Sequence, residues 1–422
     1  MVWVGLDDTD SLSGGCTTNV MHRMIKYLRT CDDSDLWEVS EYPSLVRLWP
    51  FAQRRTRGNA AVSVEIRCLD ENSEDILIGN LDRLWKELVI PEVKKYGTAT
   101  SSMHNEREQS NASPSMIFSR IKPDESWYWN CVRNEVTATQ CLDQIPEGCR
   151  VWEFNGGHGK IGALAAISWH GDHDNTWEVT AYRKSENIAK TRVIPINISQ
   201  QIDQEFPETI MNRDPTNDKS LLSPNTPCPV LFGVRSETAE GAIFAAESII
   251  KSEGCEDVSG WQIWRTNQAT DDHIVSSHSA TLSSNPITIK QGHTILRTNE
   301  FGDLVSFSQG GDVNRLAQNL RQGDQIEFSG LEAPDGSMHI EKLRIISISN
   351  KRKLRPLCSC GKRMKSMGSG QGIRCPNCGE RDGDIWSQEV NSEVPFALGE
   401  WVEPSPSNRR HLSSPLSRRS PA

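Results

Sequence analysis

The sequence predicts a multidomain α+β protein, and three observations lead to this fold class. The chain has 422 residues, which is too long for one hydrophobic core, so we expect about three domains. Helix-like and strand-like segments alternate through the first two thirds, whereas short strands separated by Gly and Asp turns follow from Pro286 to Ser349. Four cysteines then cluster between Cys358 and Cys378. We therefore expect α+β domains first, a small β domain next and a metal-binding segment near the end.

Composition places the chain among globular proteins of a reducing compartment. Hydrophobic residues make up 36% and charged residues 24%, and no apolar run approaches the roughly 18 residues of a membrane span. The N-terminus lacks a signal-peptide pattern, so we expect a cytoplasmic protein with no membrane partner. Because disulfides are rare in the cytoplasm, we expect the twelve cysteines to be free thiols apart from one metal site. A net charge of −10 argues against a general nucleic-acid binder but allows a local basic patch.

An acidic, glycine-bearing loop near the start is the first candidate site. Residues 2–6 read as a short buried strand, and residues 19–28 carry apolar residues at helical spacing. Between these segments lie three carboxylates and a glycine pair: Asp7, Asp8, Asp10, Gly14 and Gly15. Carboxylates bind a hard divalent cation, while loop amides and a helix N-terminus favour a phosphate. The loop predicts a magnesium and nucleotide site, although a polar turn with a helix cap would show a similar pattern.

Two further segments are candidates for phosphate contact. Two strand-like runs flank a basic turn that ends in Gly58 and Asn59, and Arg47 or Arg57 could meet a phosphate there because a guanidinium group suits oxyanions. A hairpin with solvated arginines explains that turn equally well. Farther along, Lys160 lies in a glycine-rich stretch that resembles a phosphate-binding loop, but no Ser or Thr follows the lysine. Its small residues could equally serve close helix packing.

The C-terminal third contains a predicted β-barrel and a predicted zinc site. Five short strands with a helix between the third and fourth are typical of an OB fold, although other small barrels share this pattern. The paired cysteines that follow suit tetrahedral zinc: Cys358, Cys360, Cys375 and Cys378. The first pair is Cys-x-Cys, which is unusually short. Basic residues around these cysteines and in the tail favour a nucleic-acid partner.

Several short motifs run along nearly the whole chain in a fixed order. They are Gly-Leu-Asp-Asp-Thr-Asp-Ser with Gly-Gly-Cys-Thr-Thr, Thr-Arg-Gly-Asn, Gly-Lys-Ile-Gly-Ala-Leu-Ala-Ala, Asn-Thr-Pro-Cys-Pro-Val-Leu-Phe-Gly-Val-Arg, Thr-Asn-Gln-Ala-Thr-Asp, Gly-Gln-Gly-Ile-Arg-Cys and Arg-Arg-His-Leu-Ser. Each motif is weak alone, but the ordered set resembles the archaeal tRNA-isoleucine 2-agmatinylcytidine synthetases. The shortened Cys-x-Cys pair departs from that family's Cys-x-x-Cys.

The resemblance implies an architecture of four domains and a tail. These are a kinase-like α/β catalytic domain that binds ATP, a ferredoxin-like domain associated with agmatine, an OB-fold β-barrel, a zinc ribbon and a basic C-terminal tail. On this chain we place them, in that order, at residues 1–135, 136–284, 285–350, 351–386 and 387–422.

The resemblance also implies an ATP-dependent ligase that modifies tRNA. Such an enzyme activates the carbonyl of the wobble cytidine in isoleucine tRNA with a CAU anticodon, then attaches agmatine to form agmatidine, which enables AUA decoding. In the family the first threonine after the cysteine becomes phosphorylated, which implies Thr17 here, whereas Thr18 reads as a helix cap. The implied Mg²⁺ ligands are Asp7, Asp8 and Asp10. The implied contacts to ATP are Gly14, Gly15, Arg47, Arg57, Gly58, Asn59 and Lys160.

Two other functions are also compatible with the sequence. The chain could be a non-catalytic tRNA-binding protein built on the OB fold and the zinc ribbon, although the retained acidic loop and Thr17 argue against this. It could also be a related ligase that uses another amine, because the motifs specify the activation step better than the nucleophile.

Overall fold

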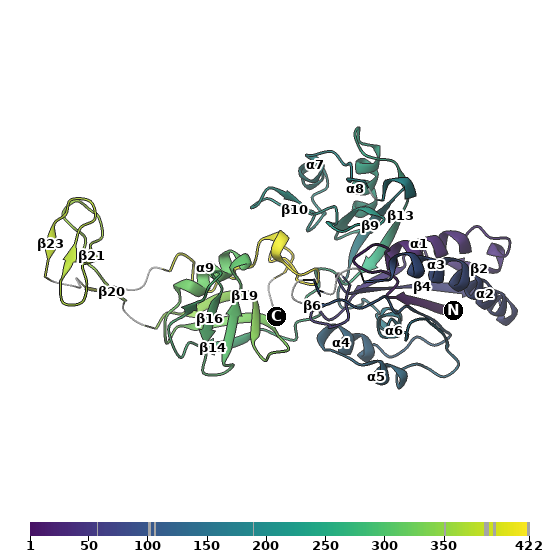
Figure 1. The fold of residues 1–422 in the computed structure, drawn as a ribbon, viewed down its shortest axis with the longest axis horizontal. Coiled ribbons are helices and arrows are strands. Elements are labelled where there is room, and N and C mark those ends of the chain that lie inside the picture. The colour runs from purple at the N-terminus through teal and green to yellow at the C-terminus, as the bar shows by residue number, and fades with distance from the viewer. Residues whose placement is uncertain are drawn as a thin grey trace. The chain divides into compact units, whose positions relative to one another are not determined.

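The chain folds into two compact units. The computed structural model describes residues 1–56, 58–99, 103–104, 107–188, 190–349, 352–383, 388–390 and 394–419. Met1–Val275 and Ser405–Arg419 form the first unit, and Ser276–Pro404 forms the second. The chain therefore leaves the first unit at Val275 and returns to it at Ser405 (Figure 1). In the described ranges, no helix is both long enough and apolar enough to cross a membrane.

A nine-stranded sheet forms the centre of the first unit. Its order is β12-β9-β13-β3-β4-β1-β7-β8, with β2 paired to β4. β1 (Val2–Asp7) lies between β4 (Ala60–Cys68) and β7 (Ser115–Ser119) and is antiparallel to both. The other strands are β2 (Trp37–Val39), β3 (Ser44–Arg47), β8 (Arg150–Glu153), β9 (Thr176–Arg183), β12 (Val230–Ser236) and β13 (Val258–Thr266). Strands from both sides of residue 135 pair with each other, so the sheet crosses the predicted first boundary without a break.

Helices cover both faces of this sheet. Side chains alternate along β1, so Val2, Val4 and Leu6 enter a core with α1 (Thr17–Leu28), α2 (Glu71–Leu84) and α3 (Ile90–Tyr96). The opposite face packs against α4 (Ser126–Arg133), α5 (Ala138–Leu142) and α6 (Lys160–Ser168). Gly5 faces α6 so closely that a Cβ atom there would lie 2.3 Å from the carbonyl oxygen of Ala163. Helix α6 therefore rests directly on the backbone of β1.

A third core lies at the β12 end of the sheet. There β9, β12 and β13 pack against α8 (Ala239–Lys251) and α7 (Ile198–Glu205). α8 begins at the N-cap Thr238, whose side chain accepts a hydrogen bond from the amide of Gly241. A short ribbon of β10 (Arg213–Asp214) and β11 (Lys219–Ser220) stands beside this core (Figure 1).

The second unit contains a six-stranded sheet in the order β14-β18-β19-β17-β16-β15. Its elements are β14 (His278–Thr281), β15 (Ile287–Thr288), β16 (Thr294–Arg297), β17 (Asp303–Ser306), α9 (Asp312–Asn319), β18 (Gln325–Glu332) and β19 (Met338–Ser347). This ladder is open, and an isolated bridge joins Leu282, just after β14, to Thr298, just after β16. β14 precedes residue 285, so the β domain begins earlier than the sequence predicted. Five short strands follow: β20 (Arg352–Leu354), β21 (Lys365–Ser366), β22 (Ile373–Arg374), β23 (Arg381–Asp382) and β24 (Gln388–Val390). The multidomain α+β class is confirmed.

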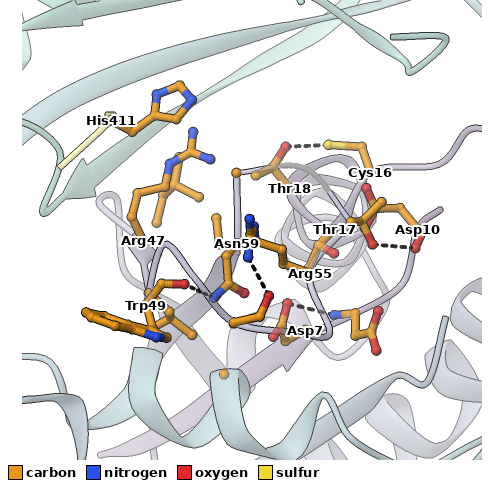
Figure 2. A pocket seen from close by; sticks show the side chains of 18 of the residues that line it. Asp7, Asp10, Cys16, Thr17, Thr18, Arg47, Trp49, Arg55, Asn59 and His411 are labelled. Atoms are coloured by element: carbon orange, nitrogen blue, oxygen red, sulfur yellow. Dashed lines mark hydrogen bonds between the residues drawn. The ribbon is translucent and has the colours of Figure 1, made fainter. Parts of the chain in front are cut away.

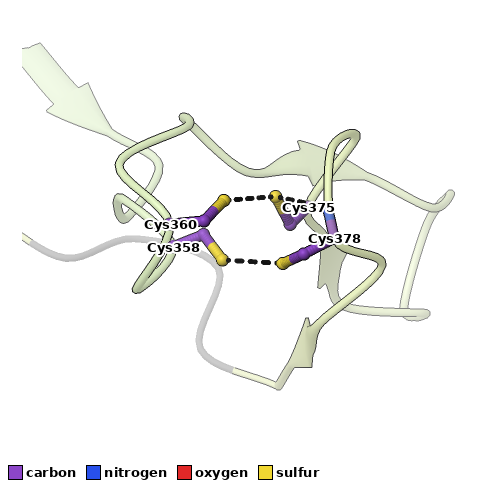
Figure 3. A group of neighbouring side chains, drawn as sticks. All are labelled: Cys358, Cys360, Cys375 and Cys378. Atoms are coloured by element: carbon purple, nitrogen blue, oxygen red, sulfur yellow. Dashed lines mark hydrogen bonds between the residues drawn. The ribbon is translucent and has the colours of Figure 1, made fainter.

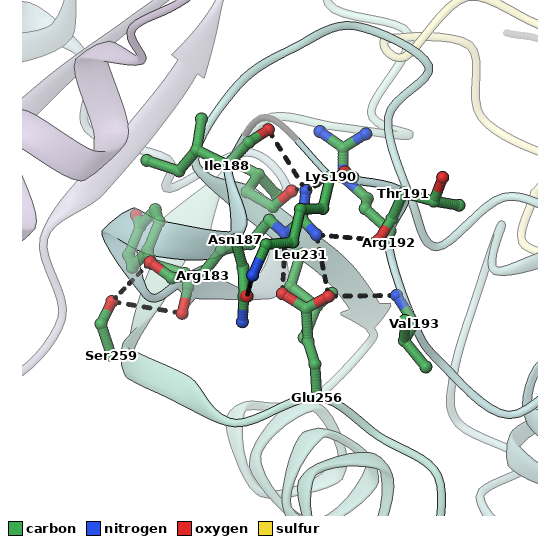
Figure 4. Close-up of polar contacts among 12 residues, drawn as sticks. Arg183, Asn187, Ile188, Lys190, Thr191, Arg192, Val193, Leu231, Glu256 and Ser259 are labelled. Atoms are coloured by element: carbon green, nitrogen blue, oxygen red, sulfur yellow. Dashed lines mark hydrogen bonds and ion pairs between the residues drawn. The ribbon is translucent and has the colours of Figure 1, made fainter.

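A buried ion pair stabilises the third core from inside. The Nε and Nη2 atoms of Arg183 lie 2.7 and 2.9 Å from the two carboxylate oxygens of Glu256, and the two side chains are 1% and 8% exposed. Arg183 also donates to the carbonyls of Lys190 and Thr191, and the amide of Val193 donates to Glu256 (Figure 4). The pair therefore holds the loop before α7 against the sheet. Burial alone would raise the pKa of Glu256, but these hydrogen bonds and the charge of Arg183 lower it.

Glu256→Gln should destabilise the protein strongly at neutral pH, because it leaves the buried Arg183 charge without a counter-charge. We expect a loss of about 3–5 kcal/mol in the free energy of unfolding, measured by urea titration. Since the folded state lowers the pKa of Glu256, the pair's contribution is present above the ordinary pKa of 4.5 and is lost as the pH falls below it. The difference in the free energy of unfolding between the parent and the variant should therefore become smaller below that pH. Glu247→Gln, which removes an exposed partner of Lys251, is the matched control and should change little. A pH-independent difference would contradict the role of the pair.

Candidate active site and metal centre

A cavity of about 630 Å³ opens in the first unit beside the C-terminal end of β1 (Figure 2). Acidic residues of the N-terminal loop form one wall, and strand ends with arginines form another. Its size suits a nucleotide, since ligand sites of about 300–1,000 Å³ are typical. The N-terminal part of α6 closes the cavity floor at Gly159 and Gly162.

The acidic wall is held in an unusual backbone conformation. Asp8 has φ of 59°, in the left-handed region that Asp and Asn tolerate better than most residues. The amide of Asp8 donates to Oδ1 of Asp7 at 2.7 Å. Oδ2 of Asp8 accepts a hydrogen bond from the amide of Ser113 at 3.1 Å. A Cβ atom on Gly162 would lie 2.0 Å from Oδ2 of Asp7, so only glycine fits there. The strand end, the turn and the helix together fix both carboxylates.

The carboxylates lie close together in a poorly solvated place. Burial and the neighbouring carboxylate of Asp8 raise the pKa of Asp7 well above its usual value. Burial and the charge of Asp10 raise the pKa of Asp8 to about 7. A divalent cation would offset this repulsion, and oxygen ligands of this kind are those that Mg²⁺ prefers. Among the described residues, however, the three carboxylates do not converge into one compact ligand group as the four cysteines do.

Thr17 stands at the first turn of α1, next to the acidic wall. It lines the cavity, and its Oγ1 accepts hydrogen bonds from the amide and the hydroxyl of Thr9 at 3.3 and 3.1 Å. Thr18 lines the cavity too, and its hydroxyl lies 3.0 Å from Sγ of Cys16. The N-cap of α1 is Cys16 and makes no side-chain cap bond, so the expectation that Thr18 caps this helix is wrong.

The opposite wall carries the buried Arg235 and the half-buried Arg47 near one buried carboxylate. Glu178 on β9 lies 3.4 Å from Nε of Arg235 on β12, and Gln268 donates to the same carboxylate. Arg47, at the end of β3, is held through its backbone: its amide and carbonyl bond the side chain of Asn267 at 2.7 and 2.9 Å. Burial raises the pKa of Glu178, but the charges of Arg235 and Arg47 together with hydrogen bonds from Gln268 and Thr180 lower it. Two positive charges against one negative charge leave this wall suited to an anion.

His411 reaches the cavity from the C-terminal segment (Figure 2). The positive charge of Arg47, together with burial and the charge of Arg235, holds the pKa of His411 well below its usual value. The imidazole is therefore neutral at neutral pH. The segment is fixed by two backbone hydrogen bonds, from Ala269 to His411 and from Asp271 to Leu412, each 2.8 Å long.

The structure brings most of the predicted site residues together. Those that line the cavity are Asp7, Asp8, Asp10, Thr17, Arg47, Gly58 and Asn59. Lys160 does not line it, because its ammonium pairs with the carboxylate of Glu153. Gly14 and Gly15 also lie outside the lining; both have positive φ, and a Cβ on Gly14 would meet the ring of Tyr96 at 2.6 Å, so they shape the turn. Arg57 lies outside the described residues.

The sequence did not single out the residues of the arginine wall beyond Arg47. Glu178, Arg235 and His411 come from β9, β12 and the C-terminal segment, which are far apart in the chain. The density of hydrogen-bonding side chains after Thr266 was a signal, because Asn267 and Gln268 position this wall.

The four predicted zinc ligands form one compact cluster (Figure 3). Their sulfur atoms, from Cys358, Cys360, Cys375 and Cys378, all lie within 4.8 Å of one another. The Sγ atoms of Cys358 and Cys378 are 3.2 Å apart, and those of Cys360 and Cys375 are 3.5 Å apart. Zn–S bonds of about 2.3 Å in a tetrahedron place sulfurs about 3.8 Å apart. The shortened Cys-x-Cys pair therefore still brings both of its thiols into a cluster of tetrahedral size.

Models of protein families match three parts of the chain. Residues 3–155 match the TiaS TCKD domain, residues 157–273 match the TiaS FLD domain, and residues 355–394 match the TiaS C-terminal zinc ribbon domain. The division between the first two models falls later than the predicted boundary at residue 135.

Curated relatives match along almost the full length. The chain is 31% identical to the isoleucine-tRNA 2-agmatinylcytidine synthetase TiaS of Archaeoglobus fulgidus, over 99% of this chain and 97% of the relative. It is also 31% identical to the enzyme of that name from Methanopyrus kandleri, over 98% of this chain and 96% of the relative.

Solved structures share the fold over the same length. A tRNA fluorescent labeling enzyme matches with a TM-score of 0.79 and 29% identity, over 99% of this chain and 97% of that one. TiaS in complex with isoleucine tRNA and ATP matches with a TM-score of 0.77 and 29% identity, and TiaS with isoleucine tRNA, AMPCPP and agmatine with 0.75 and 27%, each over 99% of this chain and 97% of the other. By these matches the chain belongs to the isoleucine-tRNA 2-agmatinylcytidine synthetase family.

Proposed function

We propose that this protein is an ATP-dependent ligase that attaches agmatine to the wobble cytidine of isoleucine tRNA with a CAU anticodon. The observation that carries this proposal is the cavity, in which three carboxylates and Thr17 face a wall with Arg47 and Arg235. Full-length relatives at 31% identity bear the name of this activity. Solved relatives at 27–29% identity were determined with isoleucine tRNA, with ATP or its analogue AMPCPP, and with agmatine.

The chemistry explains why such a site needs ATP. The C2 carbonyl oxygen of cytosine is a poor leaving group. Transfer of a phosphoryl group to this oxygen lets it depart as phosphate when the amine of agmatine attacks C2 and loses a proton. Phosphoryl transfer requires mainly positioning of the two reactants and stabilisation of charge. The charged walls of the cavity could position the two reactants and stabilise the charge that develops during transfer.

The carboxylates and the basic wall would act on the phosphates of ATP in different ways. Asp7, Asp8 and Asp10 would hold Mg²⁺, which supplies charge neutralisation at the phosphates when bound. Arg47 and the turn at Gly58 and Asn59 are placed to contact phosphate oxygens, because they line the same cavity. In this proposal Thr17 is the residue that becomes phosphorylated, as the family resemblance implies.

Three finer fold assignments accompany this proposal. The kinase-like part, predicted at residues 1–135, would extend through the first matched segment to residue 155. The ferredoxin-like part, predicted at 136–284, would lie within residues 157–273, where β9, α8, β12 and β13 share a separate core. The six-stranded sheet would be an OB fold. Its support is α9, which lies between β17 and β18, and the bridge from Leu282 to Thr298, which links the first strand back to the third.

The main test offers the full chain ATP, Mg²⁺, unmodified isoleucine tRNA and, separately, several amines, and then analyses the nucleosides by mass. Formation of agmatidine only with agmatine is the expected result. Binding of tRNA without turnover would instead support a non-catalytic binding protein. A different adduct would support a related ligase that uses another amine.

Asp8→Asn should abolish ATP consumption while leaving tRNA affinity within about twofold of the parent. Asparagine keeps an oxygen acceptor for the Ser113 amide and tolerates the positive φ, so the change removes mainly the charge. Asp75→Asn, an exposed change on α2, is the matched control and should keep activity. ATPase rates and filter-binding titrations provide the two readouts. Equal loss of both in Asp8→Asn would contradict the assigned role.

The cysteine cluster should hold one zinc ion per chain, and Cys378→Ser should release it, because the cluster provides four thiolates for a tetrahedral ion. Zinc content by elemental analysis checks this. Cys255→Ser, at a free cysteine of the first unit, is the control and should retain one equivalent. Full zinc retention by Cys378→Ser would rule out the site.

A further inference from the structure

A second cavity of about 430 Å³ lies on the same face of the first sheet as the acidic site. Its floor is a row of cross-strand partners: Trp177 pairs with Arg265, Arg265 with Ser44, and Ser44 with Ser63. Glu65, on the same strand as Ser63, pairs with Trp3 on β1. Cross-strand partners share a face, so these side chains point to the side that α6 covers.

The length of α6 explains why this cavity exists. The helix has nine residues, so it spans only about 13.5 Å. Its N-terminal end closes the acidic site, and its last residues, Ala166 and Ile167, line the second cavity. Trp3 and Asp7 are four residues apart on β1, about 13 Å. Reacting atoms must come within about 3.5 Å, so the second cavity takes no part in chemistry at the acidic loop.

Three partly exposed aromatic side chains line this cavity. Trp3 and Trp177 are half-buried, and Tyr42 is 38% exposed. The rings of Tyr42 and Trp177 meet edge to face with centroids 4.9 Å apart, and the indole of Trp3 donates to Glu65 at 3.2 Å. Partly exposed rings that are held in place provide a surface on which a nucleobase stacks.

Two cations line the cavity together with the carboxylate of Glu65. Arg265 donates to the carbonyls of His170 and Gly171, both at 2.9 Å. Lys122 is half-buried, and its ammonium makes no hydrogen bond or ion pair with any residue that the structure describes. Burial lowers the pKa of Lys122, an effect that a bound anion would offset. The lining carries two cations, Lys122 and Arg265, against one carboxylate, Glu65, which already accepts a hydrogen bond from Trp3, so an anionic ligand is favoured over a diamine.

We propose that this second cavity binds a nucleotide, with its base against Trp3, Tyr42 and Trp177 and its phosphate at Lys122. The same chemistry could come from a residue of an RNA or from a free nucleotide. The proposal rests on the proposed function only in expecting the nucleotide to belong to the tRNA. No covalent step is involved, since the cavity is a binding site alone.

The test uses Lys122→Met in the full chain, with ATP, agmatine and Mg²⁺ left out. The matched control is Lys94→Met, which removes one exposed positive charge from the same unit and lines neither cavity. Affinity is measured for unmodified isoleucine tRNA over a range of salt concentrations, and separately for AMP. We expect tRNA affinity to fall about tenfold, the loss of one charge-assisted contact, and the salt slope to become shallower by about 0.7. Lys94→Met should change affinity less than about twofold.

Each outcome decides one question. Weaker AMP binding with unchanged tRNA binding supports the cavity but assigns it to a free nucleotide. Unchanged binding of both ligands overturns the proposal. Trp177→Leu repeats the test through the stacking surface, in case Lys122→Met fails to fold. Agmatidine formation by the parent chain is scored separately: its absence, with a Lys122 effect on tRNA affinity, would overturn the proposed function and leave the nucleotide site standing.

Discussion

The close contact between helix α6 and strand β1 determines where both cavities lie. Three glycines permit this contact. A Cβ on Gly5 would approach the carbonyl oxygen of Ala163 to 2.3 Å, one on Gly159 the carbonyl oxygen of Asp7 to 2.5 Å, and one on Gly162 the carboxylate of Asp7 to 2.0 Å. Real side chains do not tolerate such distances, so any larger residue would push the helix off the strand or displace the carboxylate. The helix is thereby fixed over the middle of the strand, with one end at the acidic loop and the other short of the opposite edge.

The walls of the larger cavity carry opposite charges, which matches the two charges of a metal-bound nucleotide. In the acidic loop, burial and the neighbouring carboxylate of Asp8 raise the pKa of Asp7, and burial and the charge of Asp10 raise that of Asp8, so a cation bound there would favour their ionised forms. The wall at Arg47 and Arg235 carries excess positive charge around Glu178. A metal-bound polyphosphate would present positive charge to the acidic wall and negative charge to the arginine wall. This complementarity is why the cavity is better explained as a nucleotide site than as a site for a neutral ligand.

Features with a local pattern could be predicted from the sequence, and features made by distant pairing could not. β1, the acidic turn and the cysteine cluster each lie within one short stretch, and the structure places them as expected. β14 was missed because its four residues show little apolar alternation and lie before the predicted boundary. Glu178 and His411 reach the site only because β9 and the C-terminal segment come together with β3, which no local pattern indicates. At Lys160 a local pattern suggested a phosphate site that the structure does not form. The glycines around Lys160 permit close helix packing, and its ammonium pairs with the carboxylate of Glu153.

The C-terminal segment serves the first unit more than its basic composition suggested. Arg418 bonds the carboxylates of Asp174 and Glu237, and Arg410 lies over the ring of Phe51 at 4.6 Å. These charges are therefore engaged within the first unit, and Ser405–Arg419 is a structural element of that unit, not a free basic arm. The outgoing segment at Asp271 and the returning segment at Leu412 hydrogen-bond each other at 2.8 Å, next to the arginine wall that His411 completes. Ser276–Pro404 is consequently an insertion whose two connections converge on the cavity, so the cavity is complete only when the chain has returned from that insertion.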